Sequence, residues 1–113
     1  MNQRQFAKYL ARDLHCFCGC MGREETYVPN HRASRGMGGS KLLDRPSNVM
    51  VMCSELNGLI ESNADLAILA KGYGWKLERW QSPEEEPIYD RATGEWYLLT
   101  NDFQRITYTK EAA

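Results

Sequence analysis

At 113 residues the chain is long enough for a single domain, residues 1–113, with a modest core. Hydrophobic residues make up 42% of it and charged residues 26%, as in ordinary globular proteins. No apolar run approaches the roughly 20 residues of a membrane helix, and no secretory signal precedes the first charges. We therefore expect no membrane partner and a cytoplasmic location.

The net charge of −1 is unevenly distributed along the chain. Residues 1–45 carry eight basic and four acidic side chains, whereas residues 51–113 carry six and eleven. A basic half suits a polyanionic partner that is met on one face. A solvated surface gives similar counts by chance, so the charge alone does not identify the partner.

The first part of the chain predicts a helix, two loops and a strand. A helix is expected over residues 2–14, because apolar residues recur there at intervals of three and four. The HCFCGC run predicts a tight loop, and residues 26–28 predict a strand that stops at Pro29. Residues 32–41 contain three glycines in four positions and predict an irregular loop.

The second part predicts a strand, a helix and several C-terminal strands. NVMVMC is typical of a buried strand over residues 48–53. A helix is expected over residues 54–71, with Ser54 as its N-cap. Further strands are expected over residues 75–80, in a hairpin that turns at residues 92–94, and over residues 103–109.

One histidine and one asparagine stand at the ends of the two predicted strands. His31 follows the first strand, and Asn48 opens the second. A neutral imidazole can take a proton from water, so His31 is our candidate general base. The alternative is a surface or capping histidine. Asn48 is a candidate partner that orients the base, and a turn asparagine would occupy the same position.

Asn57 and Glu61 lie four residues apart on the predicted helix and therefore share one face. A carboxamide oxygen and a carboxylate at this spacing can hold one divalent cation, Mg²⁺ or Mn²⁺. Such an ion stabilises the charge that develops when a phosphodiester is hydrolysed. For Glu61, a solvated or salt-bridged helix position remains an equal alternative.

The glycine-rich loop and its flanks carry four basic residues, which are Arg32, Arg35, Lys41 and Arg45. Glycines let backbone N–H groups approach an anion closely, so we expect these residues to contact DNA phosphates. The loop lacks the GxxxxGK[ST] spacing of a nucleotide P-loop. The alternative is a flexible connector.

Four cysteines, Cys16, Cys18, Cys20 and Cys53, do not resemble a secreted disulfide scaffold. They predict either a tetrahedral structural Zn²⁺ site, in which His15 could replace Cys20, or reduced thiols.

The HRASRGMGGSK, DRPSNVMVMCSELNGLIES and GYGWKL segments together resemble the HNH endonuclease family, in an HNN form. The resemblance is to the compact members that actinobacterial bacteriophages and their hosts encode. It extends from about Leu14 to Glu61. It implies an α+β fold with a ββα-metal core over about residues 14–71, an N-terminal helix and a C-terminal β-hairpin among strands at 75–109. It also implies a metal-dependent nuclease that nicks or cuts DNA.

Residue roles follow from the same resemblance. Asn48 would tie the histidine-bearing loop to the core, and Asn57 would be a metal ligand, with Glu61 as a further one. Many family members have an aspartate or a histidine immediately before the base, as the other metal ligand, where this chain has Asn30. An amide oxygen binds Mg²⁺ more weakly than a carboxylate. This departure therefore predicts metal binding that is weak or depends on a bound DNA phosphate, or else a domain that binds without cutting. The cysteines also depart from the paired CxxC knuckles of the family.

Two functions remain as hypotheses. The first is a DNA endonuclease with His31 and Asn48 as catalytic residues and Asn57, Asn30 and Glu61 as metal ligands. The second is a non-catalytic module of the same fold that binds DNA or a host protein. Some phage relatives act beside the packaging terminase, which is a candidate partner.

Overall fold

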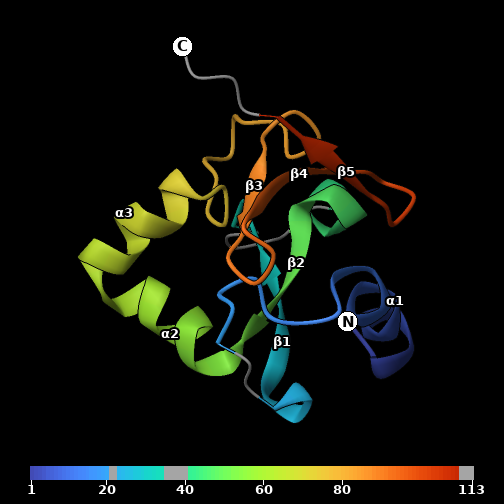
Figure 1. The fold of residues 1–113 in the computed structure, drawn as a ribbon, viewed down its shortest axis with the longest axis horizontal. Helices are drawn as coiled ribbons and strands as arrows, with labels where there is room; N and C mark the ends of the chain where they lie inside the picture. Colours follow the sequence, from blue (N-terminus) through green and yellow to red (C-terminus); the bar gives the residue numbers. More distant parts are fainter. Residues whose placement is uncertain (21–22, 35–40, 110–113) are drawn as a thin grey trace.

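A computed structural model describes residues 1–20, 23–34 and 41–109. These residues form an α+β fold with three α-helices and two small antiparallel sheets. The β1–β2 hairpin runs through the middle of the molecule, with α1 on one side and α2 and α3 on the other (Figure 1). The elements are α1 (Gln3–Asp13), β1 (Tyr27–His31), β2 (Val49–Cys53), α2 (Ser54–Ser62), α3 (Ala64–Gly72), β3 (Ile88–Asp90), β4 (Glu95–Leu99) and β5 (Arg105–Tyr108).

Helix α1 begins with a capping box, as its sequence allows. The Asn2 side chain accepts a hydrogen bond from the Gln5 N–H, and the Gln5 side chain accepts one from the Asn2 N–H. Tyr9 is buried and packs toward β2, while Arg4 and Lys8 remain exposed. The expected helix over residues 2–14 is therefore confirmed, with its end at Asp13.

Strand β2 is the centre of the core, because Val49, Met50, Val51 and Met52 are all fully buried. It pairs antiparallel with β1, from Tyr27 opposite Cys53 to His31 opposite Val49. The prediction of a buried strand here is confirmed.

Strand β1 continues through Pro29, so the prediction that it stops there is wrong. Pro29 lies opposite Val51, whose N–H donates to Asp13 Oδ2 and whose carbonyl accepts from the Phe17 N–H. Both backbone groups of Val51 therefore point away from β1. The missing N–H of proline removes no bond from the β1–β2 ladder at this position.

The single helix expected over residues 54–71 is two helices, α2 and α3. Asn63 between them has an extended backbone, and its side chain accepts hydrogen bonds from the Asp65 and Leu66 N–H groups. An asparagine that caps the next helix in this way ends the preceding one. Cys53, not Ser54, is the N-cap residue of α2.

The C-terminal strands form a three-stranded sheet in the order β3-β4-β5. The hairpin turn is confirmed, with Gly94 at a φ of 74° and its N–H donating to the Asp90 carbonyl. The strand expected over residues 75–80 is absent. Within the part of the chain that the structure describes, that segment forms only a bridge between Leu77 and Ala33. Trp75 and Leu77 are buried there, but Trp80 is exposed, so the alternation is not sustained.

Among the described residues, no helix is both long and apolar enough to cross a membrane.

Candidate functional site

The cysteines of the N-terminal loop meet the cysteine at the start of α2. The sulfur atoms of Cys16, Cys18, Cys20 and Cys53 all lie within 4.8 Å of one another. Tetrahedral zinc with Zn–S bonds of about 2.3 Å separates its sulfur ligands by about 3.8 Å, so the spacing fits one ion. Cys16 and Cys53 are buried and Cys20 is exposed, which gives an ion a route in. The four residues can therefore bind a metal such as zinc.

Hydrogen bonds already organise this cysteine cluster. The Cys16 sulfur lies 2.9 Å from that of Cys18 and accepts from the Cys53 N–H at 3.1 Å. The bond to Cys16, together with burial, raises the pKa of the Cys18 thiol, and burial raises the pKa of Cys53. Metal binding at neutral pH must therefore displace protons from these thiols.

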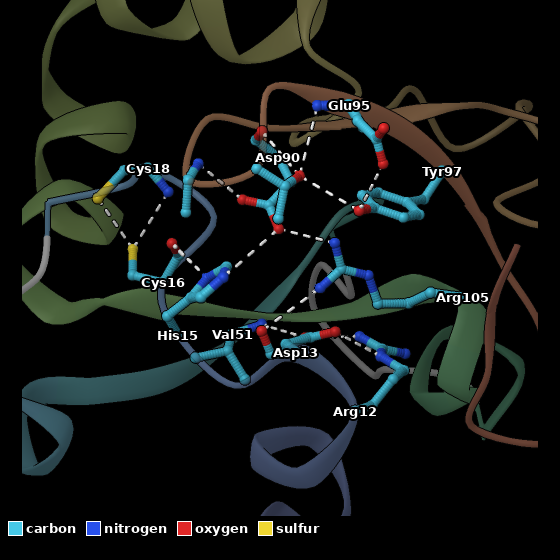
Figure 2. Close-up of polar contacts among 12 residues, drawn as sticks. Arg12, Asp13, His15, Cys16, Cys18, Val51, Asp90, Glu95, Tyr97 and Arg105 are labelled. Atoms are coloured by element: carbon cyan, nitrogen blue, oxygen red, sulfur yellow. Dashed lines mark hydrogen bonds and ion pairs between the residues drawn. The ribbon is translucent and has the colours of Figure 1, made fainter. Parts of the chain in front are cut away.

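His15 does not join the cluster, although the sequence offered it as a substitute for Cys20. Its Nδ1 lies 3.3 Å from the Cys16 carbonyl, and its Nε2 lies 3.8 Å from Asp90 Oδ2. Figure 2 shows the ring turned toward Asp90 and away from the sulfur atoms. The four-sulfur set is accordingly the better ligand group.

A buried polar network lies beside the cluster and was not predicted from the sequence (Figure 2). The Asp90 carboxylate accepts from Arg105 Nη2 at 2.7 Å, and Asp13 accepts from Arg12 and from the Val51 N–H. Both carboxylates are fully buried. The network joins the end of α1 to β2 through Asp13 and joins β3 to β5 through Asp90, and Arg105 also donates to the Asp13 carbonyl. Each buried charge keeps a partner in this way.

His31 stands at the end of β1 and is held by a residue from the loop before β2. Its Nε2 lies 2.8 Å from Asp44 Oδ1. When the proton of the neutral ring is on Nε2, Nε2–H donates a hydrogen bond to Asp44. Nδ1 then has a free lone pair that can accept a proton from water. The imidazole is partly exposed, with 22% of the side chain accessible, so water can reach it.

Asn48 ties the segment after His31 to the core, as expected. It is fully buried, accepts from the Ala33 N–H at 2.8 Å, and donates to the carbonyls of Ala33 and Leu43. These bonds close both ends of the long loop between β1 and β2. The described contact with the His31 ring comes from Asp44, which the sequence analysis did not single out. Asp44 is the single carboxylate between His31 and Asn48 in the sequence, and that signal could have identified it.

Asn30, His31 and Glu61 line one small hollow of about 30 Å³, roughly the share of one water molecule or ion. Asn30 Nδ2 donates to the Trp75 carbonyl at 3.2 Å, which leaves Oδ1 as its ligand atom. Glu61 Oε1 lies 3.8 Å from Lys76 Nζ, so both alternatives for Glu61 remain compatible with its position. Asn57 is half-buried one turn earlier on α2 and is not among the described residues lining this hollow.

The burial of Arg32 contradicts the prediction that it contacts DNA. It is 1% exposed, and its guanidinium donates to the carbonyls of four residues, which are Gly74, Ser47, Pro83 and Glu86. Burial, with Arg12 nearby, lowers the pKa of Arg32 to about 9, so the group stays charged at neutral pH. It is a structural cross-link that a phosphate cannot reach.

The other predicted phosphate contacts have different outcomes. Arg45 forms an ion pair with Glu84 at 2.9 Å, which offsets its charge. Burial raises the pKa of Glu84, but hydrogen bonds from Arg45, the backbone and Ser47 outweigh it and hold the pKa below its usual value. Arg35 lies outside the described residues, and for Lys41 only the backbone is described, so both remain predictions.

Comparison with known proteins provides no relative: no family model matches the chain, and neither a curated protein nor a solved structure matches it.

Proposed function

We propose that this chain is a metal-dependent DNA endonuclease of the HNN form of the HNH family. The observation that carries the proposal is the setting of His31. The imidazole is held by Asp44 through one nitrogen, and His31 is one of the residues that line the hollow with Asn30 and Glu61. The order of elements, strand β1, a long loop, strand β2 and helix α2, agrees with the ββα-metal core that the resemblance implies.

In this proposal His31 takes the proton of the attacking water on Nδ1, and Asp44 stabilises the imidazolium that forms. Asn48 holds the loop so that the ring keeps its position. Asn30 and Glu61 would hold Mg²⁺ or Mn²⁺, with Asn57 as a further ligand one turn away. When bound, the cation supplies positive charge opposite the cleaved phosphate and the departing 3′ oxygen. The amide of Asn30 brings no charge, so binding is weak until a DNA phosphate adds its own.

The cysteine cluster has a separate role in the proposal. We assign it a structural Zn²⁺, because four sulfur ligands leave no open position for a substrate. The ion would join the N-terminal loop to the start of α2 and so position the helix that carries Asn57 and Glu61.

A plasmid-nicking assay with Mg²⁺ or Mn²⁺ tests the endonuclease. We expect nicking by the wild type, with loss in His31→Ala and a strong reduction in Glu61→Gln. His15→Gln is the matched control for the first variant, because His15 is the other histidine of the chain. Glu55→Gln, on the first turn of the same helix, is the control for the second. Equal nicking by all five proteins would indicate a contaminating nuclease.

The second candidate function is a binding module without efficient cleavage. One observation favours it: among the described residues that line the hollow, Glu61 is the single carboxylate, and Lys76 lies beside it. DNA, a host protein or the packaging terminase would then be the partner. DNA binding that weakens steeply with salt, without nicking in any divalent ion, would support this function.

A further inference from the structure

A second and much larger cavity adjoins His31 on the side of α1. It has a volume of about 390 Å³, which lies in the range of small-molecule sites. His31 and Asp44 form part of its wall, and His31 also lines the small hollow beside Glu61. A nucleotide strand whose phosphate lies at His31 would therefore have a neighbouring nucleotide at this cavity.

The rest of the wall offers the groups that hold a base and a phosphate. The half-buried ring of Phe103 packs on the buried ring of Tyr9, with the two centroids 5.1 Å apart, and Lys8 Nζ lies 5.3 Å from the Phe103 centroid. Gln5 adds an amide that can pair with the edge of a base. Aromatic rings beside an exposed lysine are the usual means of binding unpaired nucleotides, because every base has a face that can stack.

The backbone of Phe103 gives independent support. Its φ of 62° is in the left-handed region, which is uncommon for any residue other than glycine and carries strain. Phe103 comes from the loop after β4, far along the sequence from α1, and its ring nevertheless packs on Tyr9. Strained positions of this kind cluster at binding and catalytic sites.

We propose that this cavity receives an unpaired nucleobase next to the phosphate to be cut. This inference rests on the proposed endonuclease function and names its substrate class. The substrate is DNA with unpaired nucleotides, such as a bulge, a flap or a single strand. A base within a continuous duplex is stacked and paired, so it reaches such a cavity only after that stacking is broken.

The test uses a DNA duplex with one 2-aminopurine, either unpaired in a short bulge or paired in a complete duplex. Binding is followed by fluorescence without added Mg²⁺ or Mn²⁺, so that no strand is cut. We expect the wild type to bind the bulged DNA more tightly and to quench the unpaired base. Phe103→Gly removes the ring while suiting the positive φ, and it should weaken this binding by roughly tenfold or more. Trp80→Ala is the matched control, because Trp80 is an exposed aromatic residue outside the cavity.

Lys8→Gln supplies a second variant at an exposed position where folding is not at risk, with Arg4→Gln on the same helix as its control. It should lower the affinity for bulged DNA and flatten its salt dependence. Equal binding of bulged and paired DNA by the wild type, or unchanged affinity in Phe103→Gly, overturns the proposal.

Adding Mn²⁺ then separates the two proposals. Cleavage of paired duplex without preference for the bulge refutes the base-binding cavity and leaves the endonuclease intact. Binding through Phe103 without any cleavage refutes the endonuclease and retains the cavity as a binding site for unpaired DNA.

Discussion

The cysteine cluster and the His31 hollow both present metal-binding atoms, but they differ in how far the protein surrounds an ion. Four sulfur atoms converge within 4.8 Å around the first position. The described residues that line the hollow beside His31 include an amide and one carboxylate, so the cation proposed there would complete its shell with water or phosphate. A closed set of ligands suits a structural metal, whereas an incomplete set leaves room for a substrate.

The largest expected effect is at the cysteine cluster. Cys16→Ser should abolish binding of one equivalent of zinc and lower the free energy of unfolding by more than about 3 kcal/mol, since structural zinc contributes strongly to folding. Metal analysis after dialysis and thermal melts followed by circular dichroism measure the two effects. His15→Gln, beside the cluster but outside it, should retain the metal. A wild-type protein that retains no zinc after dialysis would contradict the assignment.

The next largest expected effect is a lower catalytic rate with little change in stability. His31→Ala should lower the rate of nicking by roughly 10²- to 10⁴-fold, the range that a positioned general base contributes. The melting temperature should change little, because His31 is partly exposed. Asp44→Asn should reduce the rate less, because it removes the charge beside the imidazole but keeps a hydrogen-bonding group. A full rate in His31→Ala would exclude the proposed role.

Asn48 should behave in the opposite way, with an effect on stability. Asn48→Ala leaves the buried N–H and carbonyl of Ala33 and the carbonyl of Leu43 without this partner. A loss of about 1–3 kcal/mol in the free energy of unfolding is expected, measurable by urea denaturation. Asn101→Ala is a control on an exposed asparagine whose side chain accepts one hydrogen bond, from the Ser47 N–H. Equal losses in the two variants would show that the loop does not depend on Asn48.

The smallest effect is electrostatic and depends on pH. The pKa of Glu84 is lowered in the folded protein, so its ionised form stabilises the fold above the ordinary glutamate pKa. That contribution is lost as the pH falls through the lowered value. Glu84→Gln should cost less than about 1 kcal/mol at pH 7, because the pair with Arg45 is partly exposed, and nothing at strongly acidic pH. Melts from pH 7 to acidic pH, with Glu85→Gln as control, test this; a cost that does not depend on pH contradicts it.

The elements that were predicted correctly depend on local signals. Strand β2 follows from an uninterrupted apolar run, and the β3–β4 hairpin follows from a glycine turn between β-forming residues. The break between α2 and α3 at Asn63 was missed. The helical pattern around this asparagine does not show that its side chain will accept hydrogen bonds from the Asp65 and Leu66 N–H groups. The continuation of β1 through Pro29 was missed because it depends on distant partners. Asp13 and Phe17 bond to the backbone groups of Val51, the residue opposite Pro29 in β2.

At the candidate site, residue types and spacing pointed to His31, Asn48 and the four cysteines. Asp44 and Lys76 were missed because their roles come from distances in space, 2.8 Å to His31 and 3.8 Å to Glu61. The error at Arg32 has the same origin. Its sequence neighbours are a histidine and a glycine-rich loop, whereas three of its four carbonyl partners lie more than forty residues later.

The buried Arg32 guanidinium limits where the protein can be truncated. Arg32 follows the proposed base directly, and its charge is compensated by peptide groups from the stretch between α3 and β3. A shortened protein ending after α3 would keep every residue of the HNN pattern. It would nevertheless leave the buried Arg32 guanidinium without three of its four carbonyl partners. The minimal working unit must therefore extend at least through Glu86, well beyond the part that carries the motif.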